Sequence, residues 1–576
     1  MTTELPAAED QPRLDRLSAG LILACAVIAV LPLLARGNSC GHDFDFHLQS
    51  WMEVAHQWRE GVWYPRWFDA ANYGAGEPRL LFYPPLSWIA GGGLGTLLPW
   101  NVAPFAYVFL AFAGCGFSAF LLAREWLPAA PARLAACMYL ANPYLLFVAY
   151  ERGAFGELLA AVWIPLVMLF TLRRRAALLP LSLAIAAVWL TNAPAAVMAC
   201  YTAALLAVLT AVQLRQWWPV VRVAFGSVLG IALAGFYVVP AAFERRWVEI
   251  DRAIGSGMRV EDSFLFGHTG EAFHDQVLRT ASWIAVALLA LAALAAWRAL
   301  ASKDAVDLSR SLAVLLVVIA FLLFPFSEPL WRYAPELKFL QFPWRWLLVA
   351  GASGAMLVGI AVSQSLSRLK QNWLRASIPL ALAALLAGCA TKVYWQPCDD
   401  EDAVVAQVAT FRAGAGFEGT DEYTPRGADN TAIQRGLPPV RFLARAGDDA
   451  AESSVEPNPE WKGSDSPAQE AQVEIRDWNA AHKSFSVHAS RDGFAVLRLL
   501  DYPAWRVRVN GVAIPARPHR SDGLMTIPVN TGISMVEVRY ESTADIDWGW
   551  GASLAALLVL IALLVMEKSW QKLRIS

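Results

Sequence analysis

Long apolar runs recur along almost the whole chain, and they constrain its fold more than any other feature. Hydrophobic residues fill 57% of the 576 positions, far more than a water-soluble core could use. The sequence therefore predicts a polytopic α-helical membrane protein, because each run is close to the length that crosses a bilayer. The predicted apolar segments are 17–36, 81–99, 102–122, 132–149, 155–172, 176–191, 194–213, 222–243, 279–298, 311–326, 345–364, 376–392 and 548–566.

Basic clusters beside these runs predict the orientation of the chain. If the loop 37–80 lies outside and Arg124 lies inside, only one of the two segments between them can cross. Prolines and three consecutive glycines interrupt 81–99, so we expect this segment to be broken, shallow or re-entrant. Twelve crossings then leave both termini in the cytoplasm of a bacterial inner membrane, with 17–36 as a retained anchor; thirteen full spans are the alternative. The basic residues used are Arg124, Arg133, Arg173, Arg174, Arg175, Arg215, Arg222, Arg298, Lys303, Arg368, Lys370, Lys568, Lys572 and Arg574.

This topology predicts three parts. From about Gln472, apolar and polar residues alternate, and Asn510-Gly511 is typical of a two-residue hairpin turn, so we expect a small antiparallel β-sandwich outside the membrane. The three parts are a multi-span domain over 1–392 with the first outer loop at 37–80, an extracytoplasmic domain over 393–547, and a final transmembrane helix with a basic cytoplasmic tail over 548–576.

Charge and cysteine spacing argue against a nucleic-acid-binding protein and against a zinc-finger or CxxC redox site. The net charge of −2 gives no reason to expect a nucleic-acid partner, since the basic residues gather beside apolar runs. Of the seven cysteines, only Cys40 and Cys398 fall outside the predicted membrane, where they could form a disulfide. Neither CxxC nor zinc-finger spacing occurs.

The stretch GHDFDFH, at 41–47, places two carboxylates and two imidazoles directly after the first apolar run. In an extended chain, Asp43, Asp45 and His47 would share one face, and the amphipathic residues that follow predict a helix lying in the membrane interface. A divalent cation could be bound by Asp43, Asp45 and either His47 or His42. Alternatively, Asp45 caps the helix and Asp43 is merely solvated.

Two further charged clusters lie in predicted outer turns. YERGAFGE, at 150–157, holds charges that are costly at a membrane face unless they are wet, paired or used. The plainer interpretation is a surface pair between Glu151 and Arg152, with Glu157 capping the next helix. In LQFPWRW, Arg345 stands between two indoles and suits phosphate recognition, or else it is an interfacial anchor.

Together these clusters suit a lipid-linked phosphate substrate. A carboxylate near the outer leaflet can take the proton from an acceptor hydroxyl while an arginine stabilises the departing phosphate. That chemistry is sugar transfer from a polyprenyl-phosphate donor.

In overall plan the chain resembles the GT-C class of integral membrane glycosyltransferases, through Asp43-Phe44-Asp45 in the first outer loop and YPPL after it. More narrowly, GHDFDFH, NPYLLFVAYERGAFGE, LQFPWRW, GTDEYTP and DYPAWRVRVNG resemble bacterial membrane proteins labelled "6-pyruvoyl-tetrahydropterin synthase-related". Pterin synthase chemistry itself needs a zinc site with three histidines, and no such trio is apparent in the sequence.

The resemblance implies roles for individual residues around one outer cavity. Asp43 would be the catalytic base that activates the acceptor, and Asp45 would assist it or bind a metal. The arginine of LQFPWRW would hold the carrier phosphate, and the GTDEYTP loop would reach down from the outer domain. The substrate-binding residues implied are Glu151, Arg152, Arg345, Glu422 and Tyr423.

Three functions remain open from the sequence. The first is a glycosyltransferase that uses a polyprenyl-phosphate sugar to modify an envelope glycan, lipid or protein on the outer face of the membrane. The second is a flippase or transporter of lipid-linked intermediates, which the glycine-rich segment favours. The third is a non-catalytic assembly factor whose outer domain binds glycan through the aromatic run at 502–505, although that run could equally belong to the core of the sandwich.

Overall fold

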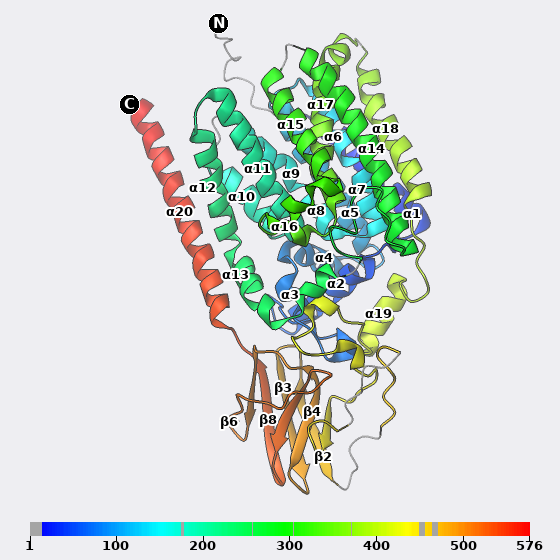
Figure 1. Cartoon of the computed structure of the whole chain (residues 1–576), viewed down its shortest axis with the longest axis vertical. Helices are drawn as coiled ribbons and strands as arrows, with labels where there is room; N and C mark the ends of the chain where they lie inside the picture. The colour runs from blue at the N-terminus through cyan, green and yellow to red at the C-terminus, as the bar shows by residue number, and fades with distance from the viewer. Residues whose placement is uncertain are drawn as a thin grey trace.

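The helices form one elongated bundle, and the β-strands lie beyond one end of it, which we call the domain end (Figure 1). The computed structural model describes residues 14–173, 178–255, 257–302, 305–369, 371–448, 456–463 and 470–575. Of the basic residues used to predict topology, Arg174, Arg175, Lys303 and Lys370 lie outside these residues.

Within the described residues, nine helical segments are long and apolar enough to cross a membrane. Two further pairs would qualify if each bent pair is one span: α12 (Trp218–Leu233) with α13 (Gly235–Glu244), and α15 (Val306–Leu322) with α16 (Glu328–Tyr333). The nine segments contain α1 (Arg16–Arg36), α5 (Ala103–Arg124), α6 (Ala129–Leu140) with α7 (Pro143–Phe147), α8 (Phe155–Ala160) with α9 (Trp163–Leu172), α11 (Ala193–Leu214), α14 (Ala272–Ala301), α17 (Leu347–Arg368), α18 (Asn372–Val393) and α20 (Ala544–Ile575).

Two predicted segments form short helices instead of full spans. The segment 81–99 becomes α4 (Pro85–Leu97), whose 13 residues rise about 20 Å, less than the ~30 Å thickness of a hydrocarbon core. Figure 1 places α4 with α2 (Phe44–Arg59) and α3 (Arg79–Phe82) at the domain end. The segment 176–191 becomes α10 (Leu178–Trp189), which packs beside α12 and α11. Within the described residues, the nine long segments and the two bent pairs give up to eleven spans by length and composition, and α10, with 12 residues, is too short to be counted with them.

The first outer loop differs from its prediction in two ways. The extended interpretation of GHDFDFH is wrong, because α2 (Phe44–Arg59) begins directly after Asp43 and turns the following side chains around a helix. Nor does α2 expose a polar face at a membrane surface: Gln49, Glu53 and Gln57 are buried. Gln49 donates to Gln407 of α19 (Val404–Ala413), and Gln57 donates to Glu53 and to a loop carbonyl. The helix is therefore enclosed between the bundle and the outer loops.

The strands form two antiparallel sheets that share one apolar core, which confirms the predicted sandwich. Asn510 and Gly511 both have positive φ, as a type I′ hairpin between β5 (Trp505–Val509) and β6 (Val512–Ala513) requires. The sequence pattern did not predict β1 (Val440–Leu443), β4 (Gly493–Leu500) and β7 (Leu524–Val529). Most of the side chains on both faces of these strands are buried, so apolar and polar residues do not alternate along them. One sheet contains β1 (Val440–Leu443), β4 (Gly493–Leu500) and β7 (Leu524–Val529); the other contains β2 (Ala471–Trp478), β3 (His482–Ala489), β8 (Gly532–Tyr540), β5 (Trp505–Val509) and β6 (Val512–Ala513).

Two links fasten the chain that follows α18 to the loop 37–80. Cys40 and Cys398, whose pairing the sequence left open, form a disulfide with their Cα atoms 4.8 Å apart. Glu77 is fully buried and accepts hydrogen bonds from Arg79 and from the backbone and hydroxyl of Thr420. The GTDEYTP loop is therefore held directly against the segment that precedes YPPL.

Candidate active site

The GHDFDFH and YERG segments pack backbone against backbone at the domain end. The Asp43 amide donates to the Arg152 carbonyl at 2.8 Å, and the next amide before it donates to the Glu151 carbonyl. A Cβ on Gly41 would lie 2.2 Å from that Glu151 oxygen, so only glycine permits this approach. Gly153 ends a π-helical turn (η2, Val148–Arg152) with φ +61°, a conformation that glycine adopts without strain. These contacts fix Asp43 beside Arg152.

A buried carboxylate, Glu157, holds two arginines together under Asp43. Arg152 Nη1 lies 2.6 Å from Glu157 Oε2, and Arg345 Nε lies 3.3 Å from the same oxygen. The Tyr144 hydroxyl donates to the other oxygen of Glu157 at 2.5 Å. The arginine side chains are 5% and 11% exposed and Glu157 is 2% exposed, so the three form a nearly dry cluster with one net positive charge.

Asp43 faces this cluster from the solvent side. Its Oδ2 lies 3.7 Å from Arg152 Nη2, beyond hydrogen-bonding distance, and 45% of its side chain is exposed. The site thus combines an accessible carboxylate with a buried, fixed positive charge. That pairing suits a reaction in which a proton leaves one group while negative charge develops on another.

Tyr83, from the YPPL motif, forms another wall of the site. Its ring is half-buried and lies 5.6 Å from the His47 ring and 5.0 Å from the Phe46 ring. Burial, reinforced by the negative charge of Asp43, raises the pKa of Tyr83, so its hydroxyl stays a proton donor at neutral pH.

The proposed metal ligands do not form a metal site. His47 is buried; its Nε2 accepts the Gly156 amide at 3.4 Å, and burial lowers the pKa of its imidazole to about 4. Burial raises the pKa of Asp45, and the charge of Asp402 adds to that effect, while the ring of His42 packs against Phe273. Among the described residues, no three His, Cys, Asp or Glu side chains gather as metal ligands would. The donor set of Asp43, Asp45 and His47 does not fit a bound cation in this structure.

The other predicted substrate residues lie away from the arginine cluster. Glu151 meets the Asp43 segment through its backbone carbonyl, and within the described part of the chain no ion pair joins its buried carboxylate to the cluster. Glu422 lies beside Glu77 and Arg79, where burial raises the pKa of its carboxyl. Tyr423 is buried and stacks in parallel on Phe82 at 5.6 Å. The predicted surface pair of Glu151 and Arg152 is also absent, since both side chains are buried.

An apolar cavity of about 350 Å³ opens next to the cluster. Leu340 connects the two features: it lines the cavity, and its carbonyl accepts a hydrogen bond of 2.8 Å from Arg345 Nη1. The Gln341 side chain accepts from the same nitrogen at 3.2 Å. The lining also includes Phe82, Trp189, Val197, Tyr237, Phe339 and Tyr423.

The chain is similar, at low identity, to solved structures of two proteins. The arabinofuranosyltransferase AftD from Mycobacteria is 13% identical, with a TM-score of 0.44; the alignment covers 92% of this chain and 58% of AftD. ArnT from Cupriavidus metallidurans, solved with bound undecaprenyl phosphate, is 13% identical with a TM-score of 0.28, over 69% of this chain and 88% of ArnT. Likenesses this distant assign no activity, and no curated protein matches in sequence.

The family comparison is more direct. Residues 80–395 match the family described as "6-pyruvoyl-tetrahydropterin synthase related domain; membrane protein". The matched region runs from the first outer loop through α18 and includes YPPL, YERGAFGE and LQFPWRW. Because the match covers more than half of the chain, the protein belongs to the 6-pyruvoyl-tetrahydropterin synthase related family of membrane proteins.

Proposed function

We propose that the protein is a glycosyltransferase that moves a sugar from a polyprenyl-phosphate donor to a cell-envelope acceptor. One observation carries this proposal: the exposed carboxylate of Asp43 faces two buried arginines that share Glu157. An accessible carboxylate can take the proton of an acceptor hydroxyl, and the fixed positive charge beside it can stabilise negative charge that develops on a phosphate.

In the proposed reaction, Asp43 accepts the proton of an acceptor hydroxyl. The hydroxyl oxygen bonds to the anomeric carbon of the donor sugar as the bond from that carbon to the phosphate oxygen breaks. The bonding electrons stay with the carrier phosphate, whose added negative charge Arg152 and Arg345 stabilise. Glu157 does no chemistry; it holds both guanidinium groups in place, so little reorganisation is needed when the charge develops.

The apolar cavity supports a lipid-linked donor in particular. Its walls are mainly aliphatic and aromatic, and the two charged residues in the lining, Arg245 and Glu336, pair with each other at 3.7 Å. The carbonyl of Leu340 accepts a hydrogen bond from Arg345, which we propose as the phosphate ligand. A carrier phosphate at Arg345 would therefore have an apolar space beside it for the first isoprene units.

We further propose that the domain end faces away from the cytoplasm. Disulfides persist in oxidising compartments, and the disulfide of Cys40 and Cys398 lies at this end. Arg133 and Arg173 lie at the other end, where they pair with Asp15 and Glu125. This orientation is the one that the positive-inside bias predicts.

A cellular experiment tests the proposed activity. A strain that lacks the protein is complemented with the wild type, with Asp43→Asn, or with Asp400→Asn, a control that removes an exposed acid in the outer chain. We expect Asp43→Asn to abolish one envelope glycan modification at normal protein levels, while Asp400→Asn retains it. Unchanged glycan with Asp43→Asn would remove the catalytic assignment.

A lipid transporter is the second candidate, because two helix pairs bend sharply, by 76° between α12 and α13 and by 96° between α15 and α16. Transport of a fluorescent polyprenyl-phosphate sugar across vesicles by both the wild type and Asp43→Asn would favour this candidate. If the protein is a glycosyltransferase, neither the wild type nor Asp43→Asn should transport the lipid.

A further inference from the structure

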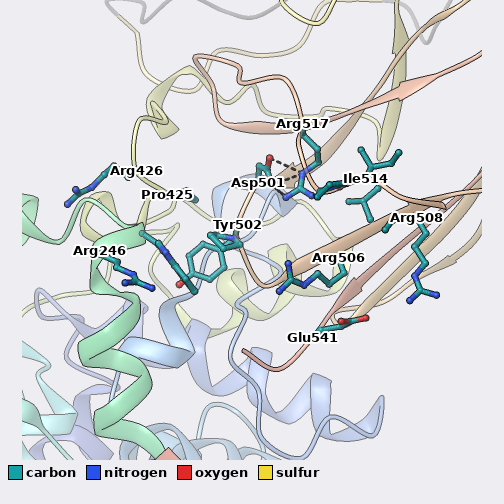
Figure 2. Close-up of a pocket in the computed structure, with 15 residues that line it drawn as sticks. Arg246, Pro425, Arg426, Asp501, Tyr502, Arg506, Arg508, Ile514, Arg517 and Glu541 are labelled. Carbon is teal, nitrogen blue, oxygen red and sulfur yellow. Dashed lines mark hydrogen bonds and ion pairs between the residues drawn. The ribbon is translucent and has the colours of Figure 1, made fainter. Parts of the chain in front are cut away.

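A second, strongly basic cavity lies where the end of α13 meets the β domain, and we call it the arginine cavity (Figure 2). Its volume is about 710 Å³, twice that of the apolar cavity. Five arginines but only two carboxylates line it. These residues are Arg246, Arg426, Arg506, Arg508, Arg517, Asp501 and Glu541.

Strand alternation explains how β5 contributes two of the arginines. In the sequence WRVRV, Trp505 and Val507 are buried in the sandwich core, and Arg506 and Arg508 project from the opposite, exposed face. Arg246 comes from the membrane domain, in the turn (η3, Arg245–Trp247) that ends α13. The cavity therefore joins the two domains through residues of the same charge.

Most of this positive charge is not neutralised. Arg517 is bound to Asp501 through two nitrogens, at 2.6 and 3.1 Å. Within the described ranges, none of the other four arginines pairs with a carboxylate, and Arg246 instead lies 3.7 Å above the ring of Phe243. These four arginines are exposed, and such a concentration of cationic side chains beside few carboxylates creates a positive potential that attracts an anionic ligand.

The arginines are spread along a path, which bears on the shape of the ligand. Figure 2 shows Arg246 and Arg426 on the side of the membrane helix, and Arg506 and Arg508 on the far side of Tyr502, along β5. A third cavity of about 480 Å³ shares Arg246 and Arg426 and continues the path toward Lys338. A lipid headgroup would occupy only the membrane side of such a path, whereas a long chain with repeated anionic groups could contact all of it.

We propose that the arginine cavity binds an anionic glycan that carries phosphate or carboxylate groups at intervals along its chain. The arginines bind these groups through paired hydrogen bonds, and the path along β5 sets the direction of the glycan. Binding at this site does not involve Asp43 and is independent of the transferase proposal.

The test measures binding by the full-length protein in nanodiscs of zwitterionic lipid. The probes are a poly(glycerol phosphate) oligomer, an oligogalacturonate and a neutral dextran of similar length. We expect both anionic probes to bind, more weakly as salt rises, and the dextran not to bind. The double variant Arg506→Gln with Arg508→Gln should weaken anionic binding at least about tenfold, because each exposed arginine loses a charge-assisted contact.

The matched control is Arg412→Gln with Arg476→Gln, which removes the same charge from exposed positions outside the cavity. It should change the affinity less than about twofold. Absence of anionic binding, or equal weakening by the control, would overturn the proposal. The proposal would also be overturned if the double variant lowered affinity only in nanodiscs that contain anionic lipid, because the ligand would then be a lipid headgroup. Asp43→Asn should bind like the wild type, which separates this inference from the catalytic one.

Discussion

Replacing Glu157 by glutamine should destabilise the protein strongly, although the two side chains have almost the same shape. Glu157 is the shared counter-ion of Arg152 and Arg345, whose side chains are only 5% and 11% exposed. Glutamine removes the buried counter-ion of both guanidinium groups, leaves only the partly exposed carboxylate of Asp43 near Arg152, and can turn an amide N–H₂ toward the arginines. Breaking a buried ion pair from one side costs about 3–5 kcal/mol, so we expect a loss of that size in the free energy of unfolding.

Unfolding in mixed detergent micelles with increasing SDS measures this loss. Glu125→Gln is the matched control: Glu125 pairs with Arg173 at 2.7 Å, but the two side chains are 25% and 35% exposed. A partly solvated pair of this kind is worth no more than about 1 kcal/mol. If Glu157→Gln cost as little as the control, Glu157 would not be the buried anchor of the two arginines.

Three further predictions follow from the same region. Gly41→Ala places a Cβ 2.2 Å from the Glu151 carbonyl, so it should cost about 1–3 kcal/mol in SDS unfolding and displace Asp43, whereas Gly20→Ala meets nothing within 4 Å and should be neutral. Because the folded pKa of His47 is lowered from 6.5 to about 4, the unfolded chain takes up its proton first as the pH falls. The free energy of unfolding should therefore drop by about 3 kcal/mol between pH 6.5 and 4. His47→Gln should remove this pH dependence; if the variant kept it, another group would be its cause. Mass spectrometry of unreduced protein should recover a peptide pair joined through Cys40 and Cys398. Cys398→Ser should lower the free energy of unfolding by about 2–4 kcal/mol. Free thiols at both positions in protein from intact cells would contradict the pairing.

Hydropathy and charge predicted most of the membrane architecture, because a bilayer leaves a chain few alternatives. The interrupted segment 81–99 does form the short helix α4, and the turn at Asn510 and Gly511 does join two strands. The aromatic run at 502–505 belongs to the sandwich core, since Tyr502 and Trp505 are fully buried. Patterns of this kind are local, and local patterns are what a single sequence displays.

The centre of the candidate site was not predictable in the same way. Glu157 resembled a helix cap beside Arg152; its second partner, Arg345, lies 188 positions further along the chain, so no spacing could reveal the pair. The interfacial prediction for α2 failed for a related reason. The polar residues Gln49, Glu53 and Gln57 suited a solvated face, but all three are buried. Gln49 bonds to α19, and the loop at 67–70 bonds to Glu53 and Gln57.

Direct assay of sugar transfer tests the central claim most sharply. Purified protein in proteoliposomes is given radiolabelled polyprenyl-phosphate sugars together with envelope glycans from a strain that lacks the protein. The wild type should transfer label to an acceptor, and Asp43→Asn should lower the rate about a hundredfold or more while donor binding is retained, because only the proton acceptor is lost. Transfer by Asp43→Asn at the wild-type rate would contradict the account.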